Sequence, residues 1–216
     1  MSDQILNITN GEYFNAHFLS KFGGVAVPFC EAMMDGEATR EIYSKHFIAL
    51  RAQSLGVPEC EYRSKMHVYD ALNSNRYQAI CLWFGKDTFC QMNLLTLLAY
   101  LEQIQYVGAL KLNYIDDETF QVLEADIDVT LGIYETIFEE ILIAKRTPRE
   151  VGVLCAEAID LYFDYHSEHG MLANLIKTNA HKDRTALIGL LLKQSKNYGL
   201  SDLQAEKLIH SHLSNG

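Results

Sequence analysis

Polar and acidic side chains recur directly after short apolar segments in the first part of this chain. They occur at Asn10-Gly11-Glu12, from Glu31 to Glu37, from Asp87 to Asn93 and at Asp116-Asp117. If the apolar segments are parallel strands, these groups meet at one edge of the sheet, where open α/β sheets bind their ligands. Helices that follow the strands would add unpaired N–H groups and a positive dipole end. The pattern predicts a site for a small phosphorylated or nucleotide-like ligand.

Carboxylates in the same loops make a divalent cation such as Mg²⁺ a candidate cofactor, because hard cations favour carboxylate oxygens. The carboxylates concerned are Glu12, Glu31, Asp35, Asp87 and Asp116. Each also has a structural interpretation, since acids are favoured as helix caps and in first turns. The chain has no G-x-x-x-x-G-K-[ST] or G-x-G-x-x-G phosphate loop. It has no G-x-S-x-G nucleophile motif either, so the sequence leaves open whether the chain is an enzyme.

Gln91 and Asn93 are polar residues on the first turns of an otherwise apolar helix, where Leu or Ala would favour helicity more. Two interpretations remain open. The amides bind a ligand, or they hydrogen-bond carbonyl groups of neighbouring loops. Trp83, in the segment just before this helix, is a candidate stacking surface for a ligand, although a place in the core explains it more simply.

Four apolar segments are predicted strands, and they position these groups. They are Ile5–Thr9, Val25–Phe29, Ala79–Phe84 and Ala109–Ile115. The third (AICLWF) is continuously apolar, as is typical of a buried parallel strand. Helical patterns alternate with them, at Tyr13–Phe22, Thr39–Gly56, Pro58–Asn73 and Asp87–Gln103. This order predicts an α/β fold with an open, mostly parallel four- to five-stranded sheet and flanking helices.

From Leu131 onward every periodic segment predicts a helix, which gives an all-helical C-terminal region. Thr147-Pro148-Arg149-Glu150 combines a capping box with proline at the first helical position and predicts a helix start. Ser201 and Gln204 form a second capping box before the last predicted helix. We expect a boundary near Arg146, between an α/β domain of residues 1–145 that holds the site and a helical region of residues 146–216.

Charge and composition limit the class of protein. Residues 1–145 carry 10 basic and 20 acidic residues, whereas residues 146–216 carry 8 of each. Nucleic-acid binding needs a positive field, so a nucleic-acid partner is not expected. No segment has the ~20 apolar residues of a membrane span, and the first residues show no signal-peptide pattern. The five cysteines form no C-x-x-C pair and indicate reduced thiols. We therefore expect a cytoplasmic protein without a membrane partner or a dedicated metal site.

Three strand-end segments also carry a resemblance. L-N-I-T-N-G-E (6–12), P-F-C-E-A-M-M-D-G-E (28–37) and L-W-F-G-K-D-T-F-C-Q-M-N-L-L (82–95) resemble the signature segments of a bacterial family known as domain of unknown function 1835. The last is the most specific: Trp83, Asp87, Gln91, Leu94 and Leu95 match its L-W-x-x-x-D-x-x-x-Q-x-x-L-L pattern. Y-G-L-S-D-L-Q-A-E-K-L-I (198–209) is similar to the family's closing segment. The resemblance implies a shared fold and a shared site, not a particular activity.

The chain departs from the family pattern at four positions. Asn7 stands where a histidine is usual, so a catalytic role that rests on that histidine would be lost. Glu12 replaces a usual aspartate, and Phe29 and Glu31 stand where tryptophan and aspartate are usual. The predicted ligand-binding residues are Asn10, Gly11, Glu12, Glu31, Asp35, Trp83, Asp87, Gln91 and Asn93.

Two other functions remain open. The helices predicted at 184–197 and 201–212 could form a helix-turn-helix pair of a transcriptional regulator or adaptor. The acidic Asp202 and Glu206 beside Lys207 match phosphate poorly. Alternatively, the chain is a non-catalytic interaction module, for example a homodimer that buries part of its helical region.

Overall fold

Five strands form one mostly parallel sheet in the computed structural model, which describes residues 5–74 and 77–213. The strands are β1 (Ile5–Asn10), β2 (Ala26–Phe29), β3 (Ala79–Phe84), β4 (Ala109–Ile115) and β5 (Val122–Asp128). Their order in the sheet is β2-β1-β3-β4-β5. All neighbours pair in parallel except β4 and β5, which are antiparallel. The chain moves from β1 to β2 on one side and then crosses to β3 on the other. This makes the carboxyl ends of β1 and β3 the switch point of the sheet.

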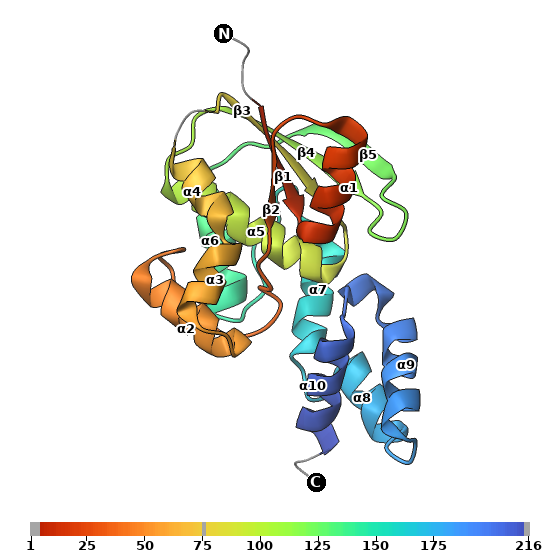
Figure 1. The fold of residues 1–216 in the computed structure, drawn as a ribbon. Coiled ribbons are helices and arrows are strands. Elements are labelled where there is room, and N and C mark those ends of the chain that lie inside the picture. The colour runs from red at the N-terminus through yellow and green to blue at the C-terminus, as the bar shows by residue number, and fades with distance from the viewer. Residues whose placement is uncertain (1–4, 75–76, 214–216) are drawn as a thin grey trace.

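Helices cover the two faces of the sheet unequally (Figure 1). On one face, α1 (Glu12–Phe22) packs Phe14 and Phe18 against Trp83 and Ile115. On the other face, α5 (Thr88–Gln103) is buried along most of its length and packs against Ile80, Leu82 and Phe84 of β3. The burial of both faces explains why β3 reads as a continuous apolar segment.

Further helices follow the strands and form the lower part of the molecule (Figure 1). Between β2 and β3 lie α2 (Lys45–Leu55), α3 (Glu59–Lys65) and α4 (His67–Asn73). After β5 come α6 (Tyr134–Phe138), the π-helical turn η1 (Glu139–Ile143), α7 (Ala156–Tyr165), α8 (Met171–Thr178), α9 (Arg184–Gln194), the 3₁₀ turn η2 (Lys196–Tyr198) and α10 (Asp202–Leu213). Helices α7 to α10 lie beyond the carboxyl ends of the strands, so the helical region faces the predicted site (Figure 1).

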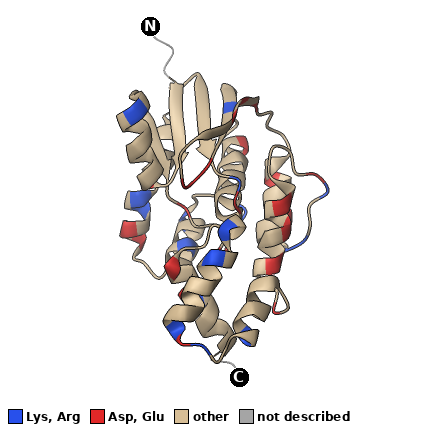
Figure 2. Ribbon diagram, turned by 90° about the vertical axis from the view of Figure 1, so that its right-hand side faces the viewer, with Lys and Arg blue, Asp and Glu red and all other residues tan. Residues whose placement is uncertain are grey.

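The helical region and the sheet share one hydrophobic core. Ile159 and Tyr162 of α7 and Ile209 of α10 belong to the same buried cluster as Leu6 and Leu82 of the sheet. Charged side chains lie mostly on helices and loops, with most of the sheet free of them (Figure 2). None of the helices in the described part of the chain is both long and apolar enough to cross a membrane.

Three local predictions differ from the structure. The segment 122–128 forms β5, which the sequence did not predict because nearly all its side chains are exposed. The predicted helix start at Thr147 is wrong: α7 begins at Ala156, after an irregular segment. The helix predicted from Pro58 to Asn73 is divided at Met66 into α3 and α4. The Ser201–Gln204 capping box is confirmed, since Gln204 N donates to Ser201 Oγ at 3.3 Å and Ser201 N donates to Gln204 Oε1 at 3.1 Å.

Candidate functional site

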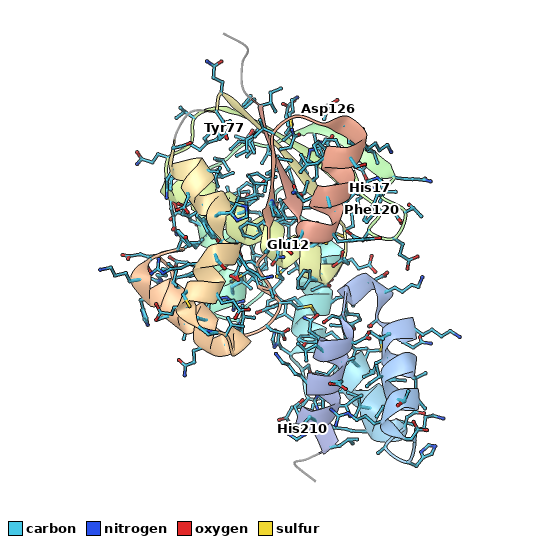
Figure 3. All side chains as sticks on the ribbon, in the orientation of Figure 1. Glu12, His17, Tyr77, Phe120, Asp126 and His210 are labelled. Atoms are coloured by element: carbon cyan, nitrogen blue, oxygen red, sulfur yellow. The ribbon has the colours of Figure 1, made fainter. Side chains whose placement is uncertain are left out.

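A cavity of about 260 Å³ lies at the carboxyl ends of β1 and β2, beside the switch point of the sheet. Its lining residues are Asn10, Gly11, Glu12, Phe29, Cys30, Glu31, Lys65 and Phe89. We call it the strand-end cavity. Four of the nine residues predicted from the sequence, Asn10, Gly11, Glu12 and Glu31, therefore line one space. Figure 3 shows Glu12 at the end of α1 nearest the helices below the sheet.

The first turn of α1 opens on the strand-end cavity. Gly11 is the N-cap residue, and no side chain caps the turn. Its φ of 82° lies in the left-handed region, which favours glycine. A Cβ at Gly11 would meet no atom within 4 Å, so a ligand can approach the backbone here. The turn thus offers backbone N–H groups and the positive end of a helix dipole to an anion.

Lys65, the last residue of α3, brings a positive charge to the same cavity. Its Nζ lies 3.7 Å from Glu12 Oε1, and both side chains are more than half exposed. Exposed ion pairs of this kind contribute little stability, so Lys65 can turn to a ligand at small cost. Cys30 lies between them, where burial and the nearby Glu12 raise the pKa of its thiol to about 11. The thiol is therefore neutral near pH 7 and not a ready nucleophile.

Glu31 is held by a buried partner. Arg51 Nε donates to Glu31 Oε2 at 3.0 Å, and neither side chain is exposed. Burial raises the pKa of Glu31, while the Arg51 guanidinium opposes that effect. The same guanidinium donates to the carbonyls of Ala32, Asp35 and Glu37, so it fixes the loop after β2. Only one carboxylate oxygen of Glu31, Oε1, lacks a hydrogen-bond partner.

Asp35 joins the loop after β2 to the helical region. Its carboxylate accepts from Tyr165 Oη at 2.8 Å and from Gln204 Nε2 at 2.7 Å. His166 Nε2 lies 3.0 Å from the carbonyl oxygen of Met34 beside it. Asp35 does not line the strand-end cavity, and its observed contacts are structural.

The side-chain amides of Gln91 and Asn93 form hydrogen bonds with loops of the protein itself. Gln91 Nε2 donates to the Gly85 carbonyl at 2.6 Å, and its Oε1 accepts from Cys155 N at 2.8 Å. Asn93 Nδ2 donates to the Glu31 carbonyl at 2.6 Å and to Asn10 Oδ1 at 3.0 Å. Its Oδ1 accepts from Met33 N at 3.0 Å. Both residues are fully buried, so the structure shows the loop-carbonyl interpretation of these amides.

Trp83 lies under α1, away from the strand-end cavity. Its ring packs against Phe18 and Phe22, and its Nε1 donates to Asn7 Oδ1 at 3.0 Å. Asn7 also donates to the Val25 carbonyl at 3.1 Å. Asn7 therefore joins β1 to the start of β2 and to the single tryptophan.

Asp87 belongs to a second polar group, at the ends of β3 and β4. It caps α5, since its Oδ1 accepts from Cys90 N at 2.9 Å. Donor atoms of Asp87, Cys90 and Asp117 lie within 4.8 Å of one another, and no other such group of three occurs among the described residues. Asn10 Nδ2 donates to Cys90 Sγ at 2.8 Å. These three side chains are the ones placed to hold a cation; Glu12, Glu31, Asp35 and Asp116 do not join them.

One carboxyl group of this cluster, that of Asp117, has a raised pKa. Burial of the Asp117 carboxyl, followed by its hydrogen bond to Asp87, raises its pKa to about 8. Asp117 as a residue is exposed, but its carboxyl lies so close to Gly85 that a Cβ there would be 1.9 Å from Oδ2. Gly199 packs equally closely on Asp87, since a Cβ added there would be 2.1 Å from Oδ1. Near pH 7 the Asp117 carboxyl is therefore mostly protonated.

A separate cavity of about 190 Å³ lies between Asp87 and the helical region. It is lined by Lys86, Asp87, Cys155, Glu157, Ala158, Leu161, Lys196 and Asn197. Thr88 Oγ1 donates to the Asn197 carbonyl at 3.2 Å, and Lys196 Nζ donates to Glu118 Oε1 at 2.8 Å. The structure thus divides the predicted site: Asn10, Gly11, Glu12 and Glu31 line one cavity, and Asp87 lines another.

Several residues of these sites were not predicted as ligand-binding. Lys65 and Phe89 line the strand-end cavity, and Cys90 and Asp117 complete the group around Asp87. Cys90 follows Asp87 by three residues on a predicted helix, a spacing that could have signalled their contact. Lys65 has no such signal, because its place depends on how α3 packs.

The helices proposed for DNA recognition pack into the molecule. Helix α10 buries Gln204, Ala205, Leu208 and Ile209 and contacts both α8 and α9. Gln204 is further held by Asp35.

Comparison of the chain with protein-family models, with curated proteins and with solved structures finds no match.

Proposed function

We propose that the protein binds a small phosphorylated or nucleotide-like ligand in the strand-end cavity. The observation that carries this proposal is the meeting of an uncapped helix N-terminus, at Gly11, with Lys65 around a cavity at the carboxyl edge of a parallel sheet. Backbone N–H groups of the first turn of α1 would bind phosphate oxygens, and Lys65 would neutralise part of their charge.

The buried groups around the cavity support its use as a binding site. Arg51 and Asn93 fasten the loop after β2, and Asn93 also fastens Asn10 after β1. Hydrogen bonds therefore hold these two loops in place before a ligand arrives, which reduces the ordering cost of binding. This arrangement supports binding and assigns no catalytic step to a residue of the cavity.

Calorimetric titration of the full chain with AMP, ribose 5-phosphate and inorganic phosphate tests the proposal. Lys65→Ala should weaken the affinity for each bound phosphorylated compound about tenfold or more, the usual contribution of a charged hydrogen bond. Arg63→Ala removes an exposed charge from the same helix without touching the cavity, so it should leave the affinity within about twofold.

Lys196→Ala distinguishes the two cavities, because Lys196 lines only the one beside Asp87. If Lys196→Ala abolishes binding and Lys65→Ala does not, the ligand occupies the other cavity and the proposal is wrong. It is equally wrong if none of the three compounds binds.

A further inference from the structure

A second cavity, of about 140 Å³, adjoins the strand-end cavity. It lies between the end of α2 and α3 and is lined by Cys30, Leu55, Val57, Glu61, Tyr62, Lys65 and Met66. Cys30 and Lys65 line both cavities, so the two spaces are neighbours across these side chains. We call the second space the helix cavity.

The helix cavity differs in chemistry from its neighbour. Leu55, Val57, Tyr62 and Met66 give it apolar walls, with Glu61 exposed at its rim. Leu55 and Val57 are only half-buried, so they present apolar surface that a ligand could cover. A thioether and an aromatic ring, as Met66 and Tyr62 provide, suit contact with a planar ring. A sugar hydroxyl would lose hydrogen bonds to water there and gain few in return.

Two buried oxygens near these cavities lack hydrogen-bond partners. They are Oε1 of Glu31, which lines the strand-end cavity, and Oη of Tyr62, which lines the helix cavity. The Tyr62 hydroxyl lies close to the Glu31 carboxylate without forming a hydrogen bond of good geometry. Buried polar groups almost always form hydrogen bonds, so an unpaired buried oxygen is a candidate contact for a ligand. Hydroxyl or amino groups of a ligand would supply donors to Glu31 after a small movement of the wall.

From these observations we infer that the ligand is a mononucleotide. Its phosphate lies at the first turn of α1 beside Lys65, and its base occupies the helix cavity against Val57, Tyr62 and Met66. This inference rests on the proposed function and adds the class of ligand. A phosphate alone, or a sugar phosphate, would leave the apolar cavity unfilled.

The test compares AMP, GMP, CMP and UMP with ribose 5-phosphate and inorganic phosphate by calorimetric titration of the full chain. At least one mononucleotide should bind tenfold or more tightly than ribose 5-phosphate. Val57→Phe fills the helix cavity and should abolish that advantage while the affinity for inorganic phosphate stays unchanged. Val107→Phe is the matched control, since Val107 is 95% exposed and lines neither cavity.

Tyr62→Phe provides a second variant that keeps the ring and removes only the unpaired hydroxyl. It should weaken mononucleotide binding several-fold and leave phosphate binding unchanged, and far-UV circular dichroism checks that each variant is folded. If ribose 5-phosphate binds as tightly as every mononucleotide, or if Val57→Phe leaves the advantage intact, this inference is wrong. The proposed function then still stands if Lys65→Ala weakens binding. If no compound binds, both are wrong.

Discussion

Asp117 illustrates how an ordinary residue acquires an unusual protonation state. It is exposed as a residue, yet its carboxyl group lies close to the backbone at Gly85 and to the Asp87 carboxyl group. Loss of hydration and the neighbouring carboxyl group both disfavour the charged form, so the pKa of Asp117 is raised. The facing titratable groups are Cys90 from α5, Asp116 from the loop after β4, and Lys196 from η2 through its pair with Glu118.

Asp117→Asn should stabilise the protein, and the gain should grow with pH. The pKa of Asp117 is about 8 in the folded chain against 3.8 for the ordinary group. Between these values the unfolded chain releases a proton that the folded chain keeps. The free energy of unfolding therefore falls as pH rises from about 4 to 8. Asp117→Asn has no titrating group at this position, so its free energy of unfolding lacks this decrease. Because the residue is exposed, we expect a gain of about 1 kcal/mol at pH 8 and almost none at pH 4.

Urea unfolding of both proteins across this pH range measures the effect. A gain that does not depend on pH would show that Asp117 does not carry the proton.

Gln91 stabilises the fold through hydrogen bonds to two backbone groups. Replacing it with leucine would leave the Cys155 N–H group and the Gly85 carbonyl without partners in the interior. Each unsatisfied buried group costs about 1–3 kcal/mol, so Gln91→Leu should lower the free energy of unfolding by about 2–4 kcal/mol. Gln53→Leu on the exposed side of α2 should change it by less than about 0.5 kcal/mol. Equal effects of the two substitutions in urea unfolding would contradict this assignment.

The loop between β2 and α2 is an irregular element that a buried arginine helps to fix. Arg51 is fully buried and donates hydrogen bonds to the Glu31 carboxylate and to three carbonyl groups of the loop. Its burial explains why the loop keeps a defined path without regular secondary structure. The same path carries Cys30 and Glu31 to the strand-end cavity and Asp35 to the helical region.

Arg51→Met should be among the most damaging single changes, because it leaves Glu31 buried without its counter-charge. Removing one partner of such a pair costs about 3–5 kcal/mol. Adding Glu31→Gln removes the stranded charge, so the double variant should lose less than the two single losses added together. A double-mutant cycle by urea unfolding measures this coupling, and strictly additive losses would show that the two residues act independently.

The elements that the sequence could predict are those whose pattern is local. The strand Ala79–Phe84 and the helix after it were predicted from their continuous apolar character. The pattern of predicted strands in turn placed Asn10 to Glu12 at a strand end. Tyr62, Met66 and Tyr69 recur at helical spacing within the predicted helix Pro58–Asn73, and all three are buried although the helix is divided at Met66. Strand β5 has no such pattern, because pairing with β4 holds it while its side chains remain exposed.

The composition of each site depends on contacts distant in sequence, and these were not predictable. Lys65 meets Glu12 only because α3 packs beside the end of β1. Asp117 was not predicted as a ligand-binding residue, since nothing local shows that β4 lies next to β3 and brings it to Asp87. A single sequence shows residue types and their periodicity. It does not show which strand ends are neighbours in the sheet.

At the scale of the whole molecule, the shared core predicts one cooperative unfolding transition. Trp83, the single tryptophan, lies under α1, whereas α7 to α10 contribute much of the helical signal. Tryptophan fluorescence and far-UV circular dichroism should therefore give coincident thermal transitions, because the buried cluster is continuous from β1 to α10. Two separated transitions would show that residues 146–216 fold as an independent unit.

The contact between Asp35 and Gln204 also bears on how the protein is made. The two residues are 169 positions apart, and ribosomes add about 5–20 residues per second. Roughly 10–30 s therefore pass between the synthesis of the loop after β2 and that of its fastening partner on α10. During this interval the nascent sheet can form, but the loop that carries Cys30 and Glu31 lacks one of its anchors. The strand-end cavity would reach its final shape late in translation, after most of the chain has left the peptidyl-transferase centre.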